Sequence, residues 1–498
     1  MGPFVLEGEK SDELEVFLKV LPNCDFIALT EQLKQTNFVQ IMPKTDNCNY
    51  IWAHLRTLND GARILLFSNL TRSERFDGQI AIDGSFPGVW LLDHWTGQKV
   101  SVDFDCTNGK TIIDLSLAPV ESRVLMFDAV QSEKGLVLKE SKTEKTIELH
   151  SSDFMVKRLD DNAITLDIAK LSLGNEPLAD ISLPLTVLQE MLNERRYTGT
   201  LTLEYQFNSR GLSKGRKIRL VLEHPEYYKI IVNGKECCYE GLEHWLDIRF
   251  MPIDISGKII EGFNVIRLEC AEFRYGDKAN VHDTIARYGT EIESIYIVGD
   301  FAVLGKFTQP VYDKIYWDRW KLNPDLLALK GDTAVISDTM PLTVNRLAEF
   351  GLPFYAGKME YTVKLPKISL LPGHRLYISV EKLNAACAEI FVDDTVVGTI
   401  VAHPYQLDIT EVYKPGKKLR IVLYSTLRNL LGPHHHLDGE ILGTSPASFL
   451  PTLKAGQTWS LLAQSWQDTK KSPSDWQDDY CLINFGNVGM ISLLKKET

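Results

Sequence analysis

Apolar and polar residues alternate along much of this chain with a period of two, the pattern of a strand that buries one face. The clearest strands form a group between residues 357 and 423, and a similar group precedes it between residues 199 and 268. Both groups predict an antiparallel β-sandwich. The matching strands are Gly199–Tyr205, Ile218–Leu222, Lys229–Val232 and Val265–Leu268 in the first group, and Gly357–Val363, Leu376–Val380, Ala388–Val392 and Leu419–Leu423 in the second.

The two groups also share their turns. Asn233-Gly234 is a dipeptide that favours a tight hairpin, because both residues accept positive φ. An Asp-Ile-Ser/Thr tripeptide ends a strand in each group, and eight positions separate its aspartate from a following glycine in both copies (Asp254 to Gly262, Asp408 to Gly416). The Asp and hydroxyl side chains are expected to satisfy loop backbone groups. The spacing indicates a duplicated domain rather than a solenoid of short repeats.

The first copy resembles a known module. Ile230–Gly234, followed by Ile253–Ser256 and Gly262–Ile266, is similar to the galactose-binding-like jelly roll, the sugar-binding domain attached to many large glycoside hydrolases. The resemblance implies a jelly roll in each copy and makes a sugar ligand an expectation for either.

Other stretches resemble the C-terminal modules of bacterial glycoside hydrolases. His54-Leu55-Arg56, Leu92–Gly97 and Glu121–Phe127 are similar to the small sandwich that follows the catalytic barrel in these enzymes. Three further stretches resemble connectors and a late motif of α-L-rhamnosidase-like enzymes: Tyr296–Phe301, Gly351–Gly357 and Asn429–His435. Together the matches cover most of residues 45–498, and the chain has no room for the family's (β/α)₈ barrel.

The predicted fold is therefore mainly β and multidomain: one β-sandwich followed by two galactose-binding-like jelly rolls, with a short α/β segment at the N-terminus. A helix is expected over Pro184–Arg196, where apolar residues recur at helical spacing. The predicted ranges are 1–45 for the α/β segment, 46–150 for the small sandwich, 151–305 for jelly roll 1 with its connector, and 306–498 for a connector and jelly roll 2.

Composition narrows the classes of partner. The net charge of −12 leaves no basic stripe for phosphates, so no nucleic acid is expected. No apolar run reaches the length of a membrane span, so no membrane partner is expected. Met1–Lys10 lacks a signal-peptide pattern, which predicts either a cytoplasmic protein or a fragment of a longer one. The eight cysteines contain no Cys-x-x-Cys pair and are expected to be small buried side chains in a reducing compartment.

Few residues are candidates for catalysis, metal binding or sugar binding. Asp93, Asp254 and Asp408 have turn explanations, and no carboxylate stands at the end of a barrel strand, so no catalytic residue is assigned. His434 and His436 are weak metal candidates, since a site normally needs three or four ligands. No cofactor is expected, and a structural calcium stays open. The carbohydrate-binding candidates are aromatic residues and their neighbours, which alternatively plug the core or contact another domain: Trp245 with His244, Tyr405 with His403, and Trp95.

The resulting hypothesis is a non-catalytic C-terminal portion or subunit of a glycoside hydrolase similar to the α-L-rhamnosidases. It would support a catalytic barrel domain or subunit and bind a glycan or polysaccharide. Two alternatives stay open. One is a glycosidase or lyase whose active site lies on the β-domains, which requires a cleft with paired acids. The other is a structural or adhesive β-protein, which would have no exposed aromatic platform.

Overall fold

The computed structural model describes residues 5–6, 9–10, 39–44, 50–72, 74–93, 97, 99–129, 143–239, 241, 243–276, 289–309, 325–435, 449–466 and 476–497. The chain divides into two compact units, Met1–Glu140 and Ser141–Thr498, and each is described by itself. Antiparallel sheets dominate both units, which confirms the predicted mainly β, multidomain fold. No described helix is long and apolar enough to cross a membrane.

The first unit is a β-sandwich, here called the N-terminal sandwich. Its core lies between a four-stranded and a five-stranded sheet, where Leu65, Phe67, Ile80 and Phe127 are fully buried. The sheets are β3 (Val39–Pro43), β6 (Phe76–Asp83), β10 (Lys110–Leu117) and β9 (Asp105–Thr107), and β4 (Ile51–Thr57), β5 (Arg63–Asn69), β11 (Ser122–Phe127), β7 (Val89–Leu92) and β8 (Lys99–Ser101).

Most of the predicted α/β segment, residues 1–45, lies outside the described residues. Strands β1 (Val5–Leu6) and β2 (Glu9–Lys10) pair with each other. Strand β3 pairs in antiparallel register with β6, from Val39 opposite Ile82 to Pro43 opposite Gly78. Val39–Pro43 therefore belongs to the N-terminal sandwich, although the predicted boundary at residue 45 places it in the α/β segment.

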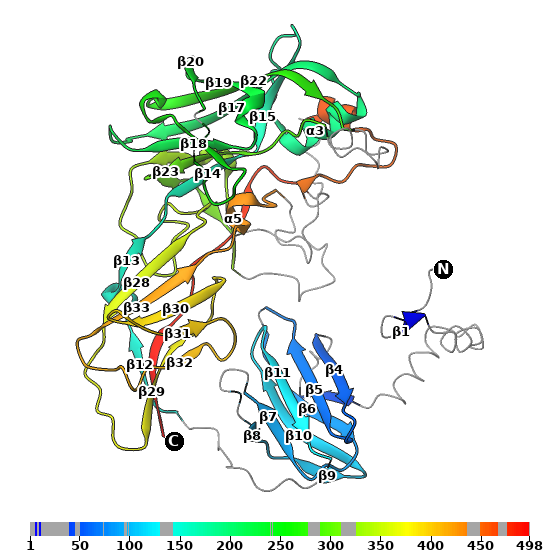
Figure 1. Cartoon of the computed structure of the whole chain (residues 1–498), viewed down its shortest axis with the longest axis vertical. Coiled ribbons are helices and arrows are strands. Elements are labelled where there is room, and N and C mark those ends of the chain that lie inside the picture. The colour runs from blue at the N-terminus through cyan, green and yellow to red at the C-terminus, as the bar shows by residue number, and fades with distance from the viewer. Residues whose placement is uncertain are drawn as a thin grey trace. The chain divides into compact units, whose positions relative to one another are not determined.

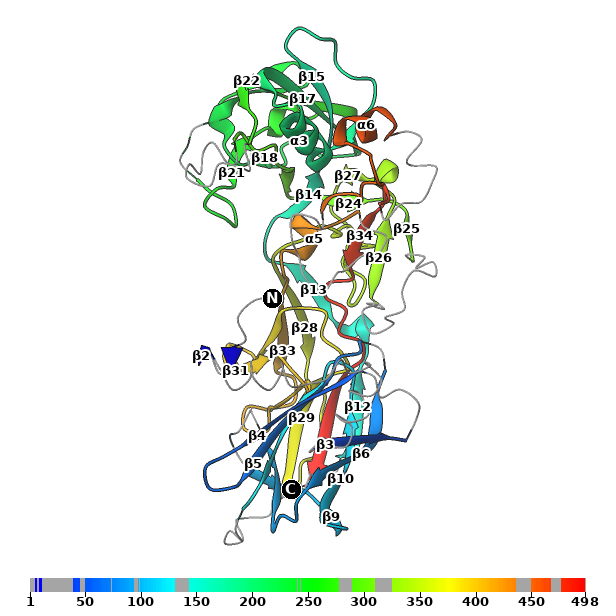
Figure 2. The same cartoon turned by 90° about the vertical axis from the view of Figure 1, so that its right-hand side faces the viewer.

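The second unit contains two sandwiches with equivalent strand orders (Figures 1 and 2). In what we call the first sandwich, β14 (Asn162–Leu166), β23 (Ile295–Gly299), β18 (Ile218–Leu222) and β21 (Met251–Asp254) form one sheet. The facing sheet is β16 (Leu183–Pro184), β15 (Ile168–Leu173), β17 (Thr198–Arg210), β22 (Gly262–Arg274), β19 (Tyr228–Val232) and β20 (Lys235–Cys237), extended by β24 (Ala302–Leu304) and β27 (Val335–Ser337).

The second sandwich repeats this arrangement. One sheet is β12 (Thr143–Leu149), β35 (Ile491–Glu497), β29 (His374–Val380) and β32 (Gln406–Asp408). The other is β13 (Met155–Arg158), β28 (Lys358–Lys364), β33 (Lys418–Tyr424), β30 (Cys387–Val392) and β31 (Thr395–Ile400).

The first sandwich is inserted within the second, a topology that the predicted tandem order did not contain. Strand β12 pairs with β35, and β13 pairs with β28 from Met155 opposite Thr362 to Arg158 opposite Met359. In Figure 1 these two early strands lie among the yellow and red strands of the second sandwich. The predicted boundaries at residues 150 and 151 therefore separate β12 and β13 from the sheets that contain them.

Hydrogen bonds repeat between the two sandwiches at equivalent positions. Asp254 Oδ1 accepts from the backbone N–H and hydroxyl of Ser256, at 2.9 and 2.6 Å. Asp408 Oδ1 accepts from Thr410 at the same two distances. These bonds confirm the predicted turns and assign Asp254 and Asp408 a structural role.

Equivalent strands of the two sandwiches also carry a cross-strand ion pair, but Glu204 lies directly opposite Arg267, whereas Glu360 lies opposite Val422 and reaches Arg420 diagonally. Arg267 Nε donates to Glu204 at 2.8 Å in the first sandwich, and Arg420 Nε donates to Glu360 at 2.9 Å in the second. In the first sandwich Asn233 and Gly234 both have positive φ, as the hairpin dipeptide predicts. The shared strand order and turns therefore support the predicted duplication of one sandwich domain.

Further elements join the two sandwiches. The strands β25 (Phe307–Thr308), β26 (Leu326–Leu329) and β34 (Tyr480–Ile483) form a small separate sheet in that order. Arg158 donates to Asp300, and the Asn162 amide donates to the carbonyls of Phe301 and Gly351.

The described helices of the second unit are α3 (Leu185–Glu194), which confirms the predicted helix, α5 (Arg428–Leu431) and α6 (Trp459–Gln464). The described 3₁₀ turns are η1 (Ser151–Asp153), η2 (Pro225–Tyr227), η3 (Ser256–Lys258) and η5 (Gly331–Thr333).

Replacing Asn264 should loosen the first sandwich. This fully buried amide donates to the carbonyls of Ile260 and Gly262 and accepts from the Ile260 N–H and from Asn233. In Asn264→Leu these groups lose their partner, and each buried unsatisfied group costs about 1–3 kcal/mol. We expect the opening free energy of the β22 amides to fall by about 2 kcal/mol or more, measured by hydrogen exchange.

Phe263→Leu is the matched control, because Phe263 is the neighbouring residue and is largely exposed. Its effect should stay within about 0.5 kcal/mol. Equal exchange in the two variants would contradict the structural role of Asn264.

Candidate functional site

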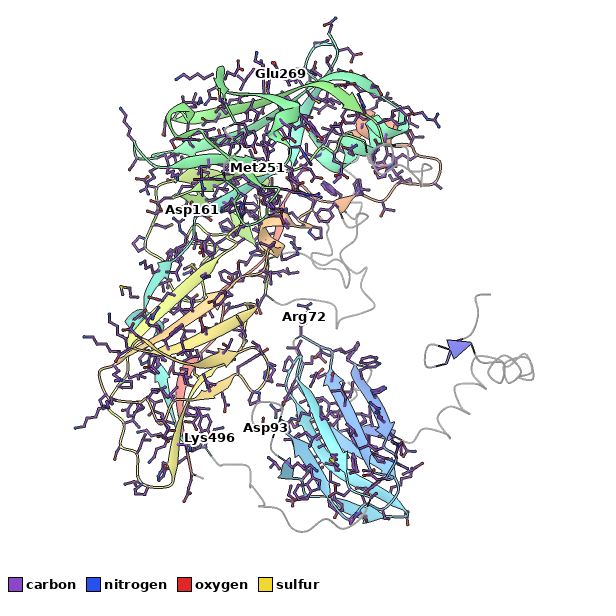
Figure 3. The ribbon with its side chains drawn as sticks, viewed as in Figure 1. Arg72, Asp93, Asp161, Met251, Glu269 and Lys496 are labelled. Atoms are coloured by element: carbon purple, nitrogen blue, oxygen red, sulfur yellow. The ribbon has the colours of Figure 1, made fainter. Side chains whose placement is uncertain are left out.

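One end of the sheet β14-β23-β18-β21 collects the loops of four strands. Because these strands run antiparallel, the segments that follow β14 and β18 meet the segments that precede β23 and β21. The register shows this directly, with Leu166 opposite Ile295 and Leu222 opposite Met251. We call this end the sheet-end site. Figure 3 labels Met251 here and Asp161 beyond the other end of the sheet.

Carboxylates gather at the sheet-end site. Glu223 follows β18 directly, and Glu291 and Glu293 precede β23. Burial raises the pKa of Glu223, although nearby Arg249 opposes the change. Glu293 remains exposed to solvent, yet its pKa is raised to about 7. The main cause is desolvation by surrounding protein atoms, and repulsion from Glu223 and Glu291 adds to it. Near neutral pH the site can therefore both donate and accept a proton.

Exposed aromatic rings border these acids. The imidazole of His224 stacks on the ring of Tyr227, with ring centroids 4.9 Å apart and planes inclined by 11°. Glu226 Oε1 lies 2.9 Å from His224 Nδ1 and orients the imidazole. Tyr227 is 49% exposed, so the pair presents a flat aromatic face to solvent. Such a face can stack on the apolar side of a sugar ring.

Trp245 and His244 lie on the loop before β21, as the sequence suggested, but they have different surroundings. His244 is exposed, whereas Trp245 is half-buried and stacks on Phe250 at 6.3 Å. The ring centroid of Trp245 also lies 6.4 Å from that of Tyr296, and the Trp245 backbone N–H donates to the Phe250 carbonyl. Trp245 therefore anchors the loop against the core and leaves only part of its ring available to a ligand.

Beneath the site, a buried polar cluster surrounds Asp167, the residue that follows β14. The Asp167 Oδ2 atom lies 3.0 Å from His435 Nε2 and 3.6 Å from His434 Nδ1, and Tyr480 donates to Oδ1 at 3.1 Å. Burial alone would raise the pKa of Asp167, but the two histidines hold that pKa well below its usual range. The cluster therefore fixes the end of β14.

The equivalent end of the second sandwich lacks this set of acids. When the strand registers of the two sandwiches are matched, Glu381 takes the position of Glu223, and Gly489 takes the position of Glu293. Glu381 Oε2 accepts from the Met490 N–H at 2.8 Å, and a Cβ on Gly489 would lie 2.5 Å from that same oxygen. The Glu381 carboxylate therefore ties the segment after β29 to the segment before β35.

The other predicted residues have structural surroundings or lie outside the described parts. Tyr405 packs against the core of the second sandwich, and its ring centroid is 3.9 Å from that of His403. Trp95 and His436 lie outside the described residues. His434 is buried, and its Nδ1 atom lies 3.6 Å from Asp167 Oδ2. Among the described residues no group of three or more His, Cys, Asp or Glu is arranged to hold a metal ion.

The buried thiols follow the prediction only in part. Cys237, Cys270 and Cys481 are buried, but Cys106 and Cys238 are exposed. Sequence reasoning also missed Glu223, Glu291 and Glu293, because no motif surrounds them and only the strand pairing brings them together.

Comparisons with known proteins give partial structural matches. No protein-family model and no curated protein matches the chain. A rhamnosidase from Novosphingobium sp. PP1Y aligns at 15% identity over 54% of this chain and 26% of its own, with a TM-score of 0.20. The β-D-glucuronidase from Dictyoglomus thermophilum aligns at 11% identity over 54% and 39%, with a TM-score of 0.21.

A Ruminococcus gnavus β-glucuronidase aligns at 12% identity over 54% of this chain and 42% of its own, with a TM-score of 0.22. The chain thus spans less than half the length of each of these glycoside hydrolases.

Neutralising Glu293 should stabilise the first sandwich at alkaline pH. Because the folded-state pKa of this carboxyl is raised from 4.5 to about 7, the destabilisation that it causes grows as the pH rises through that interval. We expect Glu293→Gln to raise the Tm by a few degrees at pH 8 and to leave it nearly unchanged at about pH 4. Thermal unfolding of both proteins at the two pH values measures this.

Glu269→Gln serves as the control, because Glu269 is an exposed carboxylate on β22 of the same sandwich. It should show the same Tm difference from wild type at both pH values. A pH-independent effect of Glu293→Gln would contradict the raised pKa.

Proposed function

We propose that this chain is a carbohydrate-binding, non-catalytic portion or subunit of a glycoside hydrolase similar to the α-L-rhamnosidases. The proposed ligand is a glycan held at the sheet-end site of the first sandwich. A catalytic barrel, supplied by another chain or by another part of the same protein, would be the partner. The second sandwich would have a structural role.

The observation that carries this proposal is the exposed His224–Tyr227 pair beside Glu223, Glu291 and Glu293. Aromatic faces pack against the C–H face of a pyranose ring, and carboxylates accept hydrogen bonds from its hydroxyl groups. Protein sites for small molecules combine a hydrophobic surface with a few convergent polar groups in this way. At the equivalent end of the second sandwich, Glu381 is engaged by the Met490 N–H of a neighbouring segment, which supports the assignment to the first.

The ordered sequence resemblances support the choice of enzyme family. They run from His54-Leu55-Arg56 in the N-terminal sandwich to Asn429–His435 beside the first sandwich. The accessory role is supported by the roles of the other conspicuous aspartates. Asp254 and Asp408 are used in turns, and Asp167 is enclosed by histidines, so these three are engaged structurally.

Glycan binding tests the proposal. The complete chain is titrated calorimetrically with neutral oligosaccharides that contain rhamnose, galactose or arabinose. We expect one class to bind and Tyr227→Ala to weaken binding about tenfold, which corresponds to about 1.4 kcal/mol. Tyr227 is suited to this test because its exposed ring can be removed with little loss of packing.

Trp52→Ala is the control variant, because Trp52 is a 64% exposed ring on the N-terminal sandwich. It should bind as wild type does. Equal affinity of the Tyr227→Ala and wild-type proteins, or binding of none of the oligosaccharides, would overturn the proposed site.

A glycosidase with its active site at the sheet-end site is the second candidate function. Glycoside hydrolysis requires one protonated and one ionised carboxyl group, and a raised pKa near neutrality is what a general acid needs. Glu293 has such a pKa, and Glu223 contributes to raising it. This pair is the specific observation that favours catalysis.

Turnover separates the two functions. The purified chain is incubated with a panel of aryl glycosides that includes an α-L-rhamnoside. The accessory function predicts no hydrolysis above that of Glu293→Gln. Hydrolysis by the wild-type chain that is lost in both Glu293→Gln and Glu223→Gln would establish the second candidate instead.

A further inference from the structure

The hydrogen bonds around His435 define its protonation state. Its Nε2 atom lies 3.0 Å from Asp167 Oδ2, and its Nδ1 atom lies 3.0 Å from the carbonyl oxygen of Gln477. Both partners are acceptors, so both ring nitrogens carry a proton when both bonds form. His435 is therefore held as an imidazolium in a buried position, where the Asp167 carboxylate supplies the compensating charge.

His434 is arranged differently. Its Nε2 atom lies 2.9 Å from the carbonyl oxygen of Asn429, to which it donates. Its Nδ1 atom faces Asp167 Oδ2 at 3.6 Å, beyond hydrogen-bond length. Burial lowers the pKa of His434, which favours the neutral form with its proton on Nε2, and a second proton would place two imidazolium rings, with centroids 6.2 Å apart, on one carboxylate.

This cluster joins three segments that are far apart in the sequence. Asp167 follows β14, His434 and His435 follow α5, and Tyr480 begins β34. Backbone bonds tie the last two segments together, since the Cys481 N–H donates to the His434 carbonyl and the Gln477 N–H to that of His435. Asp167 then links this C-terminal assembly to the sheet of the first sandwich.

Charged and titratable groups surround the cluster on every packed element. Arg428 on α5 opposes protonation of His434, and Asp478 favours protonation of His435. Tyr480 on β34, Tyr205 on β17 and Tyr296 on β23 also lie within the field of Asp167. Burial and the adjacent carboxylate raise the pKa of these tyrosines, so they stay neutral and do not compete for the proton.

We propose that Asp167, His434 and His435 form a pH-sensitive latch that fastens the loop Gly432–His435 and strand β34 to the first sandwich. The latch is closed when the three groups together hold one positive and one negative charge. Loss of the proton from His435 leaves the buried carboxylate without a counter-ion, and gain of a proton by His434 adds an unbalanced charge. The inference is independent of the proposed glycan site.

The pH dependence has two sides. Burial lowers the pKa of His435, but Asp167 more than compensates and raises it, so its contribution is complete below 6.5 and is lost as the pH rises through the raised value. Burial lowers the pKa of His434 despite Asp167, so its contribution is complete above 6.5 and is lost as the pH falls through the lowered value. The latch is therefore tightest near pH 6.5.

Hydrogen exchange of the complete chain tests the latch. After correction for the intrinsic exchange rate, peptides that contain β34 should exchange most slowly near pH 6.5 and faster at about pH 5 and about pH 8. Each unit by which a histidine pKa is shifted changes the opening constant about tenfold at full effect. His435→Gln should abolish the alkaline increase, and His434→Gln should abolish the acidic increase.

Two variants distinguish the latch from simple packing. Tyr480→Phe removes one hydrogen bond to Asp167 but neither titration, so exchange should be faster at all pH values while both increases remain. His374→Gln alters a histidine that pairs with Glu144 in the second sandwich and should leave β34 unchanged. A wild-type β34 whose corrected exchange is constant across this pH range would overturn the proposal, as would histidine variants that retain both increases.

Discussion

The pairing of β13 with β28 is the constraint on which the second unit depends. It places two strands side by side although the whole first sandwich lies between them in the chain. The first sandwich must therefore leave and return at nearly the same point. Asp160 and Asn162 on the outgoing segment accordingly bond to Lys358, Phe301 and Gly351 on the returning one. These bonds hold the two sandwiches in a defined relation.

The duplicated scaffold shows how a shared framework is used for different purposes. The strand-end turns of Asp254 and Asp408 are repeated with the same pair of hydrogen bonds. The loops at the sheet end have diverged, since Glu223 lies among other carboxylates whereas its equivalent Glu381 caps a backbone N–H. Function in such a pair follows from loop chemistry, and the framework alone does not distinguish the copies.

Local signals in the sequence were sufficient for the strands and turns. Period-two alternation, Asn233-Gly234 and Asp-Ile-Ser each have a cause within a few residues, and the structure confirms them. The insertion had no such signal, because strand pairing over long separations is not encoded in a local pattern. For the same reason the sequence did not reveal the surroundings of His434, a weak metal candidate, whose Nε2 atom donates to the Asn429 carbonyl and whose Nδ1 atom faces Asp167.

The inserted topology also imposes an order on synthesis. Strands β12 and β13 leave the ribosome first, but their partners β28 and β35 follow only after the complete first sandwich has emerged. About 200 residues separate Met155 from Thr362, so the first sandwich can close while those early strands still have exposed edges. The nascent second sandwich is thus the stage most open to mispairing and to chaperone binding, and its completion awaits the C-terminal strand β35.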